Sequence, residues 1–270
     1  MTQFSFLLLL SASIMASCAS ESTVALFEAV EHGDVTAANQ ALSNQADINF
    51  SRFSRQPLPF PCRTGQSPLN WAAYLGNEAM VTLLIEKGAD LNNPSDCTPL
   101  AMAVIANKRD VARKLISHGA LPTMKVEVGN HRLPTTVVML AAELDRSDMI
   151  EMILSENKTW SDYVDSQGRT ALFYAAELDY SDSISALVKH GASINYQVPD
   201  SGQTALAMAV VNRKLEAVRS LLSLGADPNI PYKIFGLTGT RRVTPLAVAR
   251  QGSPDIVNLL EQAGAKDSAD

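Results

Sequence analysis

The sequence is poor in the residues on which metal binding and catalysis most often depend. Its 270 residues contain only three cysteines and four histidines, and no Cys-x-x-Cys or His-x-x-x-His pair occurs. A structural zinc site is therefore disfavoured. Charged residues make up 19% of the chain, and the net charge is -6 with no long run of either sign. This balance argues against a nucleic-acid binder that works by neutralising phosphates.

Long apolar runs are missing after residue 17, where none approaches the ~20 residues that a membrane-spanning helix needs. The hydrophobic content of 46% is nevertheless too high for a disordered chain. No Gly-rich phosphate loop, Gly-x-Ser-x-Gly turn or calcium loop is present in the sequence. We therefore expect a folded protein that is not an enzyme and uses no cofactor or metal. The length suffices for one large domain or a repeat array.

The N-terminal segment, residues 1–17 (MTQFSFLLLLSASIMAS), has the features of an export signal. It contains no charged side chain, and its apolar core has the length of a signal-peptide core but is too short to span a bilayer. The following Met15–Cys18 segment resembles the bacterial lipoprotein lipobox. This resemblance implies that Cys18 is lipidated and that Ala19, being other than Asp, sends the mature protein to the periplasmic side of the outer membrane.

Two features of this segment depart from the lipobox pattern. Met15 stands where Leu is usual, and no Lys or Arg precedes the apolar core. An ordinary cleaved secretory signal, a misassigned start or a buried helix therefore stay as alternatives. Lipidation would tether the protein to the membrane, since two or more acyl chains anchor durably.

The rest of the chain is built from recurring segments, of which residues 65–92 (GQSPLNWAAYLGNEAMVTLLIEKGADLN) are the clearest copy. This copy resembles the ankyrin repeat pattern, G-x-T-P-L-H-x-A-A-x-x-G-H followed by an apolar helix ending in L-L-x-x-G-A-D-x-N. In four copies the same 21 residues separate the Ser or Thr that opens the first helix from the Gly after the second helix, as from Ser67 to Gly88. The resemblance implies an all-α fold, an elongated ankyrin-repeat α-solenoid of about seven helix-turn-helix repeats with extended hairpin fingers.

The repeats have predicted boundaries. A tether at 18–23 precedes a domain over 24–265, and a polar, frayed tail follows at 266–270; the repeats span residues 24–49, 65–92, 97–120, 134–157, 168–195, 202–229 and 242–265. Ser-Pro and Thr-Pro predict N-caps with proline in the first helical position. Glycines such as Gly88 predict helix ends in the left-handed conformation, and Asn157 occupies that place in the fourth copy. The atypical first copy is expected to be an end cap.

Three connections are longer than the repeat requires, at residues 50–64, 121–133 and 230–241. Each lies between the second helix of one repeat and the first helix of the next, so all three lengthen the fingers on one side. Insertions confined to one face commonly mark a binding face. The connections are rich in basic and aromatic residues, which suits an acidic protein partner. The alternative is that these loops only pack on their own scaffold.

The predicted partner-binding residues lie in these fingers and at the exposed ends of the first helices, where ankyrin proteins vary their contacts. The fingers contribute Arg52, Phe53, Arg55, Phe60, Lys125, Arg132, Tyr232, Lys233, Phe235 and Arg241, and the helix ends contribute Tyr74, Asp145, Arg146, Phe173, Asp179 and Tyr180.

Two cysteines lie in neighbouring predicted fingers, Cys62 and Cys97. Adjacent fingers would bring them within disulfide distance, and export would place them in an oxidising compartment. We expect the bond, with two buried free thiols as the alternative.

These observations favour a non-enzymatic, protein-binding lipoprotein that faces the periplasm. Its most specific form is an immunity-type inhibitor that binds and neutralises a secreted antibacterial toxin or effector. An envelope scaffold or a helper that stabilises a periplasmic enzyme such as a catalase is the alternative within the binding class. An enzyme with a site in the fingers, for example around His131, and a cytosolic ankyrin protein with a misassigned start are the remaining alternatives. The sequence does not indicate the oligomeric state.

Overall fold

The computed structural model describes residues 19–51, 66–93, 97–123, 135–236 and 239–267. They belong to two compact units, Met1–Val137 and Val138–Asp270, and each unit is described by itself. The described helices include none that is both long and apolar enough to cross a membrane.

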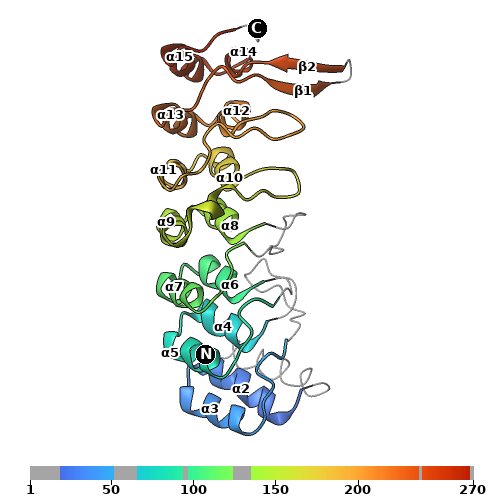
Figure 1. The fold of residues 1–270 in the computed structure, drawn as a ribbon, viewed down its shortest axis with the longest axis vertical. Helices are drawn as coiled ribbons and strands as arrows, with labels where there is room; N and C mark the ends of the chain where they lie inside the picture. Colours follow the sequence, from blue (N-terminus) through green and yellow to red (C-terminus); the bar gives the residue numbers. More distant parts are fainter. Residues whose placement is uncertain (1–18, 52–65, 94–96, 124–134, 237–238, 268–270) are drawn as a thin grey trace, which may run out of the picture. The chain divides into compact units, whose positions relative to one another are not determined.

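The first unit consists of stacked helix pairs (Figure 1). Its helices are α2 (Glu21–His32), α3 (Val35–Ser43), α4 (Pro68–Leu75), α5 (Glu78–Glu86), α6 (Pro99–Ile105) and α7 (Arg109–Ser117). Within each pair the helices pack on each other, and α4 joins the pairs by packing on both α2 and α6. The interior includes leucine, methionine, valine and alanine side chains from facing helices, among them the fully buried Leu26, Leu69 and Met80.

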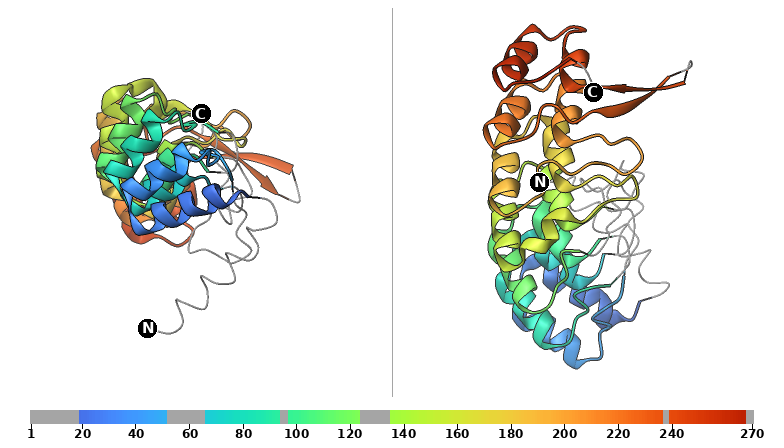
Figure 2. Two further views of the ribbon diagram at one scale, coloured as in Figure 1. Left: turned by 90° about the horizontal axis from the view of Figure 1, so that it is seen from below. Right: turned by 45° about the horizontal axis from the view of Figure 1, so that its top comes forward.

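The second unit repeats this arrangement in two rows of helices (Figures 1 and 2). Its elements are α8 (Val137–Glu143), α9 (Ser147–Glu156), the 3-10 helix η1 (Lys158–Asp162), α10 (Ala171–Leu178), α11 (Ser181–Lys189), α12 (Ala205–Val211), α13 (Leu215–Ser223), β1 (Tyr232–Gly236), β2 (Gly239–Val243), α14 (Pro245–Ala249) and α15 (Pro254–Gln262). One row contains α9, α11, α13 and α15, and α10, α12 and α14 pack together in the other. The connections between repeats project from the side of the second row.

The predicted helix starts are confirmed where Ser or Thr precedes proline. Ser67, Thr98 and Thr244 each accept a hydrogen bond from the backbone N–H three residues on, and proline follows each of them in the first turn. The predicted left-handed helix ends are also confirmed, for example at Gly88 with φ 86°. At these positions glycine avoids the steric cost that a Cβ atom imposes.

The prediction for Asn157 is wrong. This residue is extended, with φ -156° and ψ 111°, and its side chain accepts a hydrogen bond from Thr159 N at 3.0 Å. It therefore caps η1 instead of ending α9 in the left-handed conformation. The 3-10 helix begins directly after Asn157, and an N-cap residue has extended backbone angles, which exclude the left-handed conformation of a helix end.

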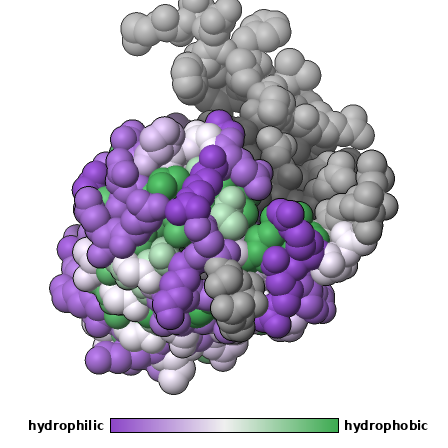
Figure 3. Space-filling view, turned by 90° about the horizontal axis from the view of Figure 1, so that it is seen from above, coloured by the Kyte–Doolittle hydropathy of each residue, from purple (hydrophilic) through white to green (hydrophobic). Residues whose placement is uncertain are grey.

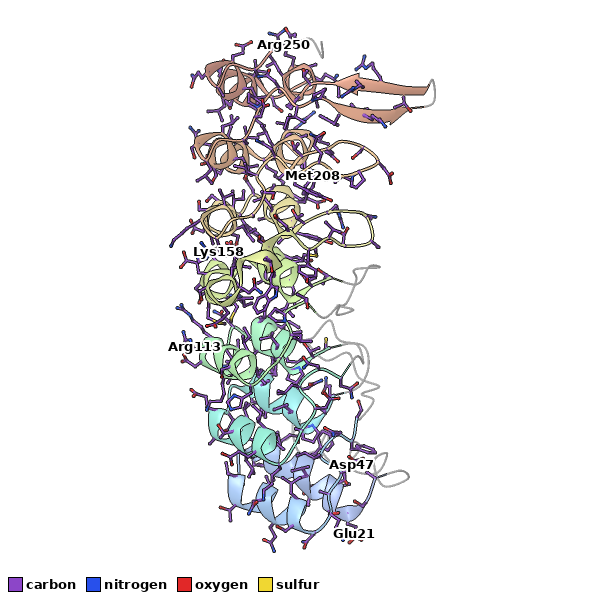
Figure 4. All side chains as sticks on the ribbon, in the orientation of Figure 1. Glu21, Asp47, Arg113, Lys158, Met208 and Arg250 are labelled. Atoms are coloured by element: carbon purple, nitrogen blue, oxygen red, sulfur yellow. The ribbon has the colours of Figure 1, made fainter. Side chains whose placement is uncertain are left out.

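Two predicted boundaries also differ from the structure. The first repeat begins before Val24, because α2 starts at Glu21 with Ser20 as its N-cap, so part of the predicted tether is helical. The start of the predicted frayed tail is bound to the fold: Lys266 N donates to Asn229 Oδ1 at 2.8 Å, and Asp267 pairs with Arg250 (Figure 4).

Side-chain hydrogen bonds connect neighbouring repeats at the turn that follows each second helix. In the first unit Asn49 accepts from Asp90 N and Asn92 accepts from Leu121 N. In the second unit the same role belongs to Asp162, Asn195 and Asn229, which accept from Ser193 N, Asp227 N and Lys266 N at 2.8 to 2.9 Å. These bonds satisfy backbone donors in the turns and fix the start of each finger.

Candidate protein-binding surface

The second unit carries three fingers that the structure describes. We name them the Asp165 finger (residues 163–169), the middle finger (residues 196–203) and the basic hairpin (Tyr232–Val243, formed by β1 and β2). The middle finger lies beside each of the others. Pro199 Cδ is 3.0 Å from where a Cβ atom on Gly168 would stand, and Lys233 N donates to Ser201 O at 2.7 Å.

Several predicted residues cannot be placed on this surface. Arg52, Phe53, Arg55, Phe60, Lys125 and Arg132 lie outside the described residues, as do Cys18, Cys62, His131 and the side chain of Phe235. Cys97 is buried and is a disulfide cysteine. Because Cys62 lies outside the described residues, its pairing with Cys97 stays a prediction.

Two predicted contact residues are buried, so the prediction that they touch a partner is wrong. Phe173 is 1% exposed and packs edge-on against Tyr196, with ring centroids 6.4 Å apart. Phe173 occupies in α10 the position that Ala207 occupies in α12, and Ala207 is also fully buried. Tyr232 is 3% exposed and packs with Ala207 and Val243 at the base of the basic hairpin.

The two aspartates at the helix ends have structural roles. Asp145 and Asp179 are the left-handed residues between paired helices, with φ 52° and 69°. Asp145 accepts from Ser183 Oγ at 2.7 Å, and Asp179 accepts from Ala217 N at 2.7 Å. Each carboxylate thus binds the first turn of the second helix in the next repeat, where the helix dipole favours negative charge.

The remaining helix-end residues are partly exposed. Tyr74 is half-buried and stacks on Trp71, with centroids 5.7 Å apart and planes inclined by 14°. Arg146 and Tyr180 are half-buried as well, on the second unit. These three stay predicted contact residues.

The Asp165 finger contains a polar network that the sequence did not predict. The Asp165 carboxylate is buried and accepts four hydrogen bonds at 2.8 to 3.0 Å, from the backbone N–H groups of Gln167 and Arg169, from Arg169 Nε and from the Tyr174 hydroxyl. Arg169 also donates to the Tyr174 hydroxyl at 2.9 Å and lies over its ring at 4.7 Å. The only local signal is the turn sequence Asp-Ser-Gln-Gly-Arg before the helix.

The network changes the protonation of its members. Burial by itself raises the pKa of Asp165, but the hydrogen bonds from Arg169, Tyr174 and Gln167 outweigh it and hold the pKa below its ordinary value. Burial raises the pKa of Tyr174 to about 12, against the opposing charge of Arg169. The network is therefore an ionised aspartate, a charged arginine and a neutral tyrosine at neutral pH.

The basic hairpin places its charges outward. The strands pair antiparallel with Tyr232 opposite Val243, Lys233 opposite Arg242 and Ile234 opposite Arg241. Lys233, Arg241 and Arg242 are exposed, and no described acidic residue forms an ion pair with them. At the base, burial raises the pKa of Tyr232 to about 12, and its hydroxyl has no hydrogen-bond partner among the described residues.

The described surface is mostly hydrophilic (Figure 3) and includes an open hollow. No group of three or more His, Cys, Asp or Glu residues in this part of the chain could hold a metal ion. A hollow of about 300 Å³ lies open between α9 and α11. It is lined by charged and small residues, of which Lys189 and Glu151 pair at 2.8 Å. Viewed from the end where α15 lies, hydrophilic side chains cover most of the described surface and hydrophobic ones form small separate patches (Figure 3).

Comparison with curated proteins finds similar segments in much longer chains. The chain is 33% identical over 109 residues to the E3 ubiquitin-protein ligase hecd-1 of Caenorhabditis elegans, which is 40% of this chain and 4% of that protein. It is 36% identical over 98 residues to dauer abnormal formation protein 25 of the same organism, 35% of this chain and 23% of that protein. The chain thus spans only a small part of the length of these relatives.

Comparison with solved structures finds matches over nearly whole chains. In the structure of Bd0816, a predatory endopeptidase from Bdellovibrio bacteriovorus, in complex with immunity protein Bd3460, one chain is 31% identical to this one with a TM-score of 0.60. The match covers 76% of this chain and 98% of that chain. The ankyrin repeat domain of Bcl-3 has a TM-score of 0.69 at 23% identity, covering 88% of this chain and 97% of its own.

The sequence profile of ankyrin repeats, in three copies, matches residues 26–126 and 138–232. These matches include most of the described helices of both units. The chain belongs to the ankyrin repeat family.

Proposed function

We propose that this protein is a non-enzymatic, protein-binding lipoprotein, and most specifically an immunity-type inhibitor that binds and neutralises a secreted antibacterial enzyme. The observation that carries the proposal is the similarity to a chain in the complex of a predatory endopeptidase with its immunity protein, at 31% identity over 98% of that chain. Fold alone would not suffice, because ankyrin repeats serve many functions.

The geometry of the second unit supports a binding role. Its fingers stand on a core of fully buried residues such as Leu206 and Leu221, so the surface is preorganised. The basic hairpin carries three exposed cations on a chain whose net charge is -6. Such a local concentration of one sign of charge steers an oppositely charged partner and sets the register of binding.

The location is part of the same proposal. Lipidation of Cys18 would hold the inhibitor at the periplasmic side of the outer membrane, where an incoming secreted enzyme first acts. Intact-mass analysis of the protein purified from its native cells tests this, since a mature chain that begins at an acylated Cys18 is expected. Cys18→Ala should release the protein from the membrane fraction, and an unprocessed Met1 would contradict the proposal.

A capture experiment tests the inhibitor function. Residues 19–270 are immobilised and exposed to secreted proteins of the native cells and of competing cells, and bound proteins are identified by mass spectrometry. We expect one secreted hydrolase in one-to-one amount, with its activity lost on binding. A triple variant, Lys233→Glu with Arg241→Glu and Arg242→Glu, should lose it. The control reverses three exposed cations away from the fingers, Lys158, Lys189 and Arg219.

The outcome decides between the alternatives. A resident envelope protein bound under ordinary growth would make the chain a scaffold or helper and would contradict the inhibitor proposal. Turnover by the purified protein that is lost in His131→Ala would replace the binding function by an enzymatic one.

A further inference from the structure

One edge of the basic hairpin is hydrogen-bonded to the middle finger, and its other edge has no described strand beside it. Lys233 N donates to Ser201 O of the middle finger at 2.7 Å, so the N–H of Lys233 points away from β2. In an antiparallel ladder the N–H and C=O of one residue point to the same side, and opposite residues alternate between bonded and non-bonded pairs. Lys233 and Arg242 therefore form a non-hydrogen-bonded pair. The backbone N–H and C=O of Arg242, and of Thr240 two residues earlier, point away from β1.

No further strand covers this outer edge in the described structure. Among the described residues no backbone hydrogen bond reaches Thr240 or Arg242 from that side, and both side chains are exposed. The middle finger has the basic hairpin as its neighbour, whereas α14 and α15 follow the hairpin without another described finger (Figure 1). An open edge of this kind is a template for an added strand.

The charges at this edge select which strand can be added. Lys233 and Arg242 lie opposite each other on one face of the hairpin, and Arg241 lies on the other face beside Ile234. Like charges directly opposite are destabilising, and the segment from Tyr232 to Val243 contains no acidic residue to relieve them. Cationic side chains on an edge disfavour pairing with neutral or basic strands. They favour a strand with carboxylates on both faces.

We propose that the open edge of β2 takes an extended acidic segment of the partner protein as a third strand of the basic hairpin. The backbone groups of Thr240 and Arg242 pair with the segment, and Lys233, Arg241 and Arg242 bind carboxylates on its two faces. This inference rests on the proposed function for the statement that the ligand is a protein. It adds the chemistry of the segment and the edge on which it lies.

A synthetic peptide tests the edge without the partner. The probe is a blocked hexapeptide, Val-Glu-Glu-Val-Glu-Glu, whose adjacent glutamates place carboxylates on both faces of an extended strand. It is titrated into residues 19–270 at low salt. Hydrogen exchange is measured at each amide. We expect exchange at Thr240 and Arg242 to slow by tenfold or more. The same peptide with every amide N-methylated keeps its charge but loses its donors, and it should bind at least tenfold more weakly. A lysine–valine peptide should not bind.

Two matched variants separate backbone pairing from charge. Thr240→Pro removes only an outward N–H and leaves the charge and the pairing with β1 in place, since proline is tolerated at an open edge. Thr240→Val keeps that N–H. We expect a loss of affinity of tenfold or more for Thr240→Pro and less than twofold for Thr240→Val. Arg241→Glu with Arg242→Glu should abolish binding, and Lys158→Glu with Arg219→Glu should not.

Several results would overturn the inference: no binding at millimolar peptide, equal binding by Thr240→Pro or by the N-methylated peptide, or slowed exchange at other amides only. Displacement of the peptide by a thymidine decamer that slows exchange at the same amides would assign the edge to nucleic acid instead. Peptide binding with no captured hydrolase would reject the proposed function alone. If a hydrolase is captured and Thr240→Pro binds it as tightly as wild type does, the strand addition alone would be rejected.

Discussion

The Asp165 finger and the basic hairpin differ in where their charges go. In the Asp165 finger the carboxylate is buried, and Arg169 is bound to it and to Tyr174. In the basic hairpin the three cations are exposed and unpaired within the described structure, and only the base is buried, by Tyr232 and Val243. Both fingers connect a second helix to the next first helix. One position in the repeat therefore carries either a stabilising network or a surface that is free to bind.

This difference bears on how the second unit can bind a partner without losing stability. A hydrogen-bonded charge network is expensive to disturb, because the buried Asp165 and Tyr174 would lose their partners. Exposed cations can be changed at little cost to the fold. Mutations should therefore separate the two fingers, with stability affected in the first and binding in the second.

The largest expected loss of stability is that of Asp165→Asn. The substitution leaves Arg169 with a neutral partner and turns an amide N–H₂ toward existing donors, so the free energy of unfolding should fall by ~3 kcal/mol. Urea unfolding of residues 19–270 measures it. Asp200→Asn, at an exposed position of the middle finger, is the matched control and should change stability by less than ~0.5 kcal/mol. Equal effects of the two changes would mean that the network does not stabilise the finger.

The stability difference between wild type and Asp165→Asn should depend on pH. Because the pKa of Asp165 is lowered in the folded state, its contribution is present above the unfolded pKa of about 3.9 and is lost as the pH falls through the lower folded value. The difference in unfolding free energy between wild type and Asp165→Asn should therefore be constant from pH 5 to 7 and shrink below pH 4. A difference that grows on acidification would contradict the direction of the shift.

Asp179 lies outside both fingers, and Asp179→Ala should lower the free energy of unfolding by ~2 kcal/mol. The carboxylate accepts from Ala217 N, and its loss removes a helix cap worth ~1 kcal/mol. Alanine at φ 69° adds backbone strain of about 1 kcal/mol. Asp179→Gly should relieve the backbone strain but not restore the cap. Its stability is therefore expected to lie between those of wild type and Asp179→Ala. Loss of partner binding with unchanged stability would instead restore the original prediction that Asp179 is a contact residue.

The two buried tyrosines allow a smaller test of the same contrast. Tyr174→Phe removes a hydroxyl that donates to Asp165 and accepts from Arg169, and should cost ~1 to 2 kcal/mol. Tyr232→Phe removes a buried hydroxyl with no described partner and should change stability by less than ~0.5 kcal/mol. Thermal unfolding of both variants checks this, and a larger cost for Tyr232→Phe would show that its hydroxyl is bound.

The smallest expected effect is a gain. Lys233→Glu replaces a like-charge pair with Arg242 by an opposite-charge pair on the same face, which should stabilise the protein by ~0.5 kcal/mol. Lys233→Gln should give about half of that gain. The same change should weaken binding of an acidic partner. A gain in stability without any loss of binding would remove Lys233 from the proposed surface.

Repetition explains which parts of the fold were predictable. Helix starts at Ser67 and Thr98 and the helix end at Gly88 follow from local backbone requirements, which recur in each copy. Phe173 was misplaced because whether a position in a first helix faces solvent or its neighbours depends on packing between repeats. Asn157 was misplaced because a 3-10 helix replaces the usual turn after α9.

The site was less predictable than the fold for a related reason. Composition predicted Lys233, Arg241 and Tyr232 as partner contacts. In the structure Lys233 and Arg241 are exposed, so they stay predicted contacts, whereas Tyr232 is buried. The buried network around Asp165 needs Tyr174 to come from the following helix, and no spacing rule marks that contact. Its members are ordinary turn and helix residues until they are folded together.

By itself the sequence determined the repeat family and the helix pairs, because these depend on caps, glycines and apolar periodicity that act over a few residues. Only the tertiary structure decided which charged side chains are paired with neighbours and which are exposed. Asp165 and Arg169 are neutralised by their neighbours, while Arg241 and Arg242 stand on an edge that no described strand covers. The reason is physical: burial and pairing are properties of what surrounds a side chain, and these surroundings come from residues distant in the chain.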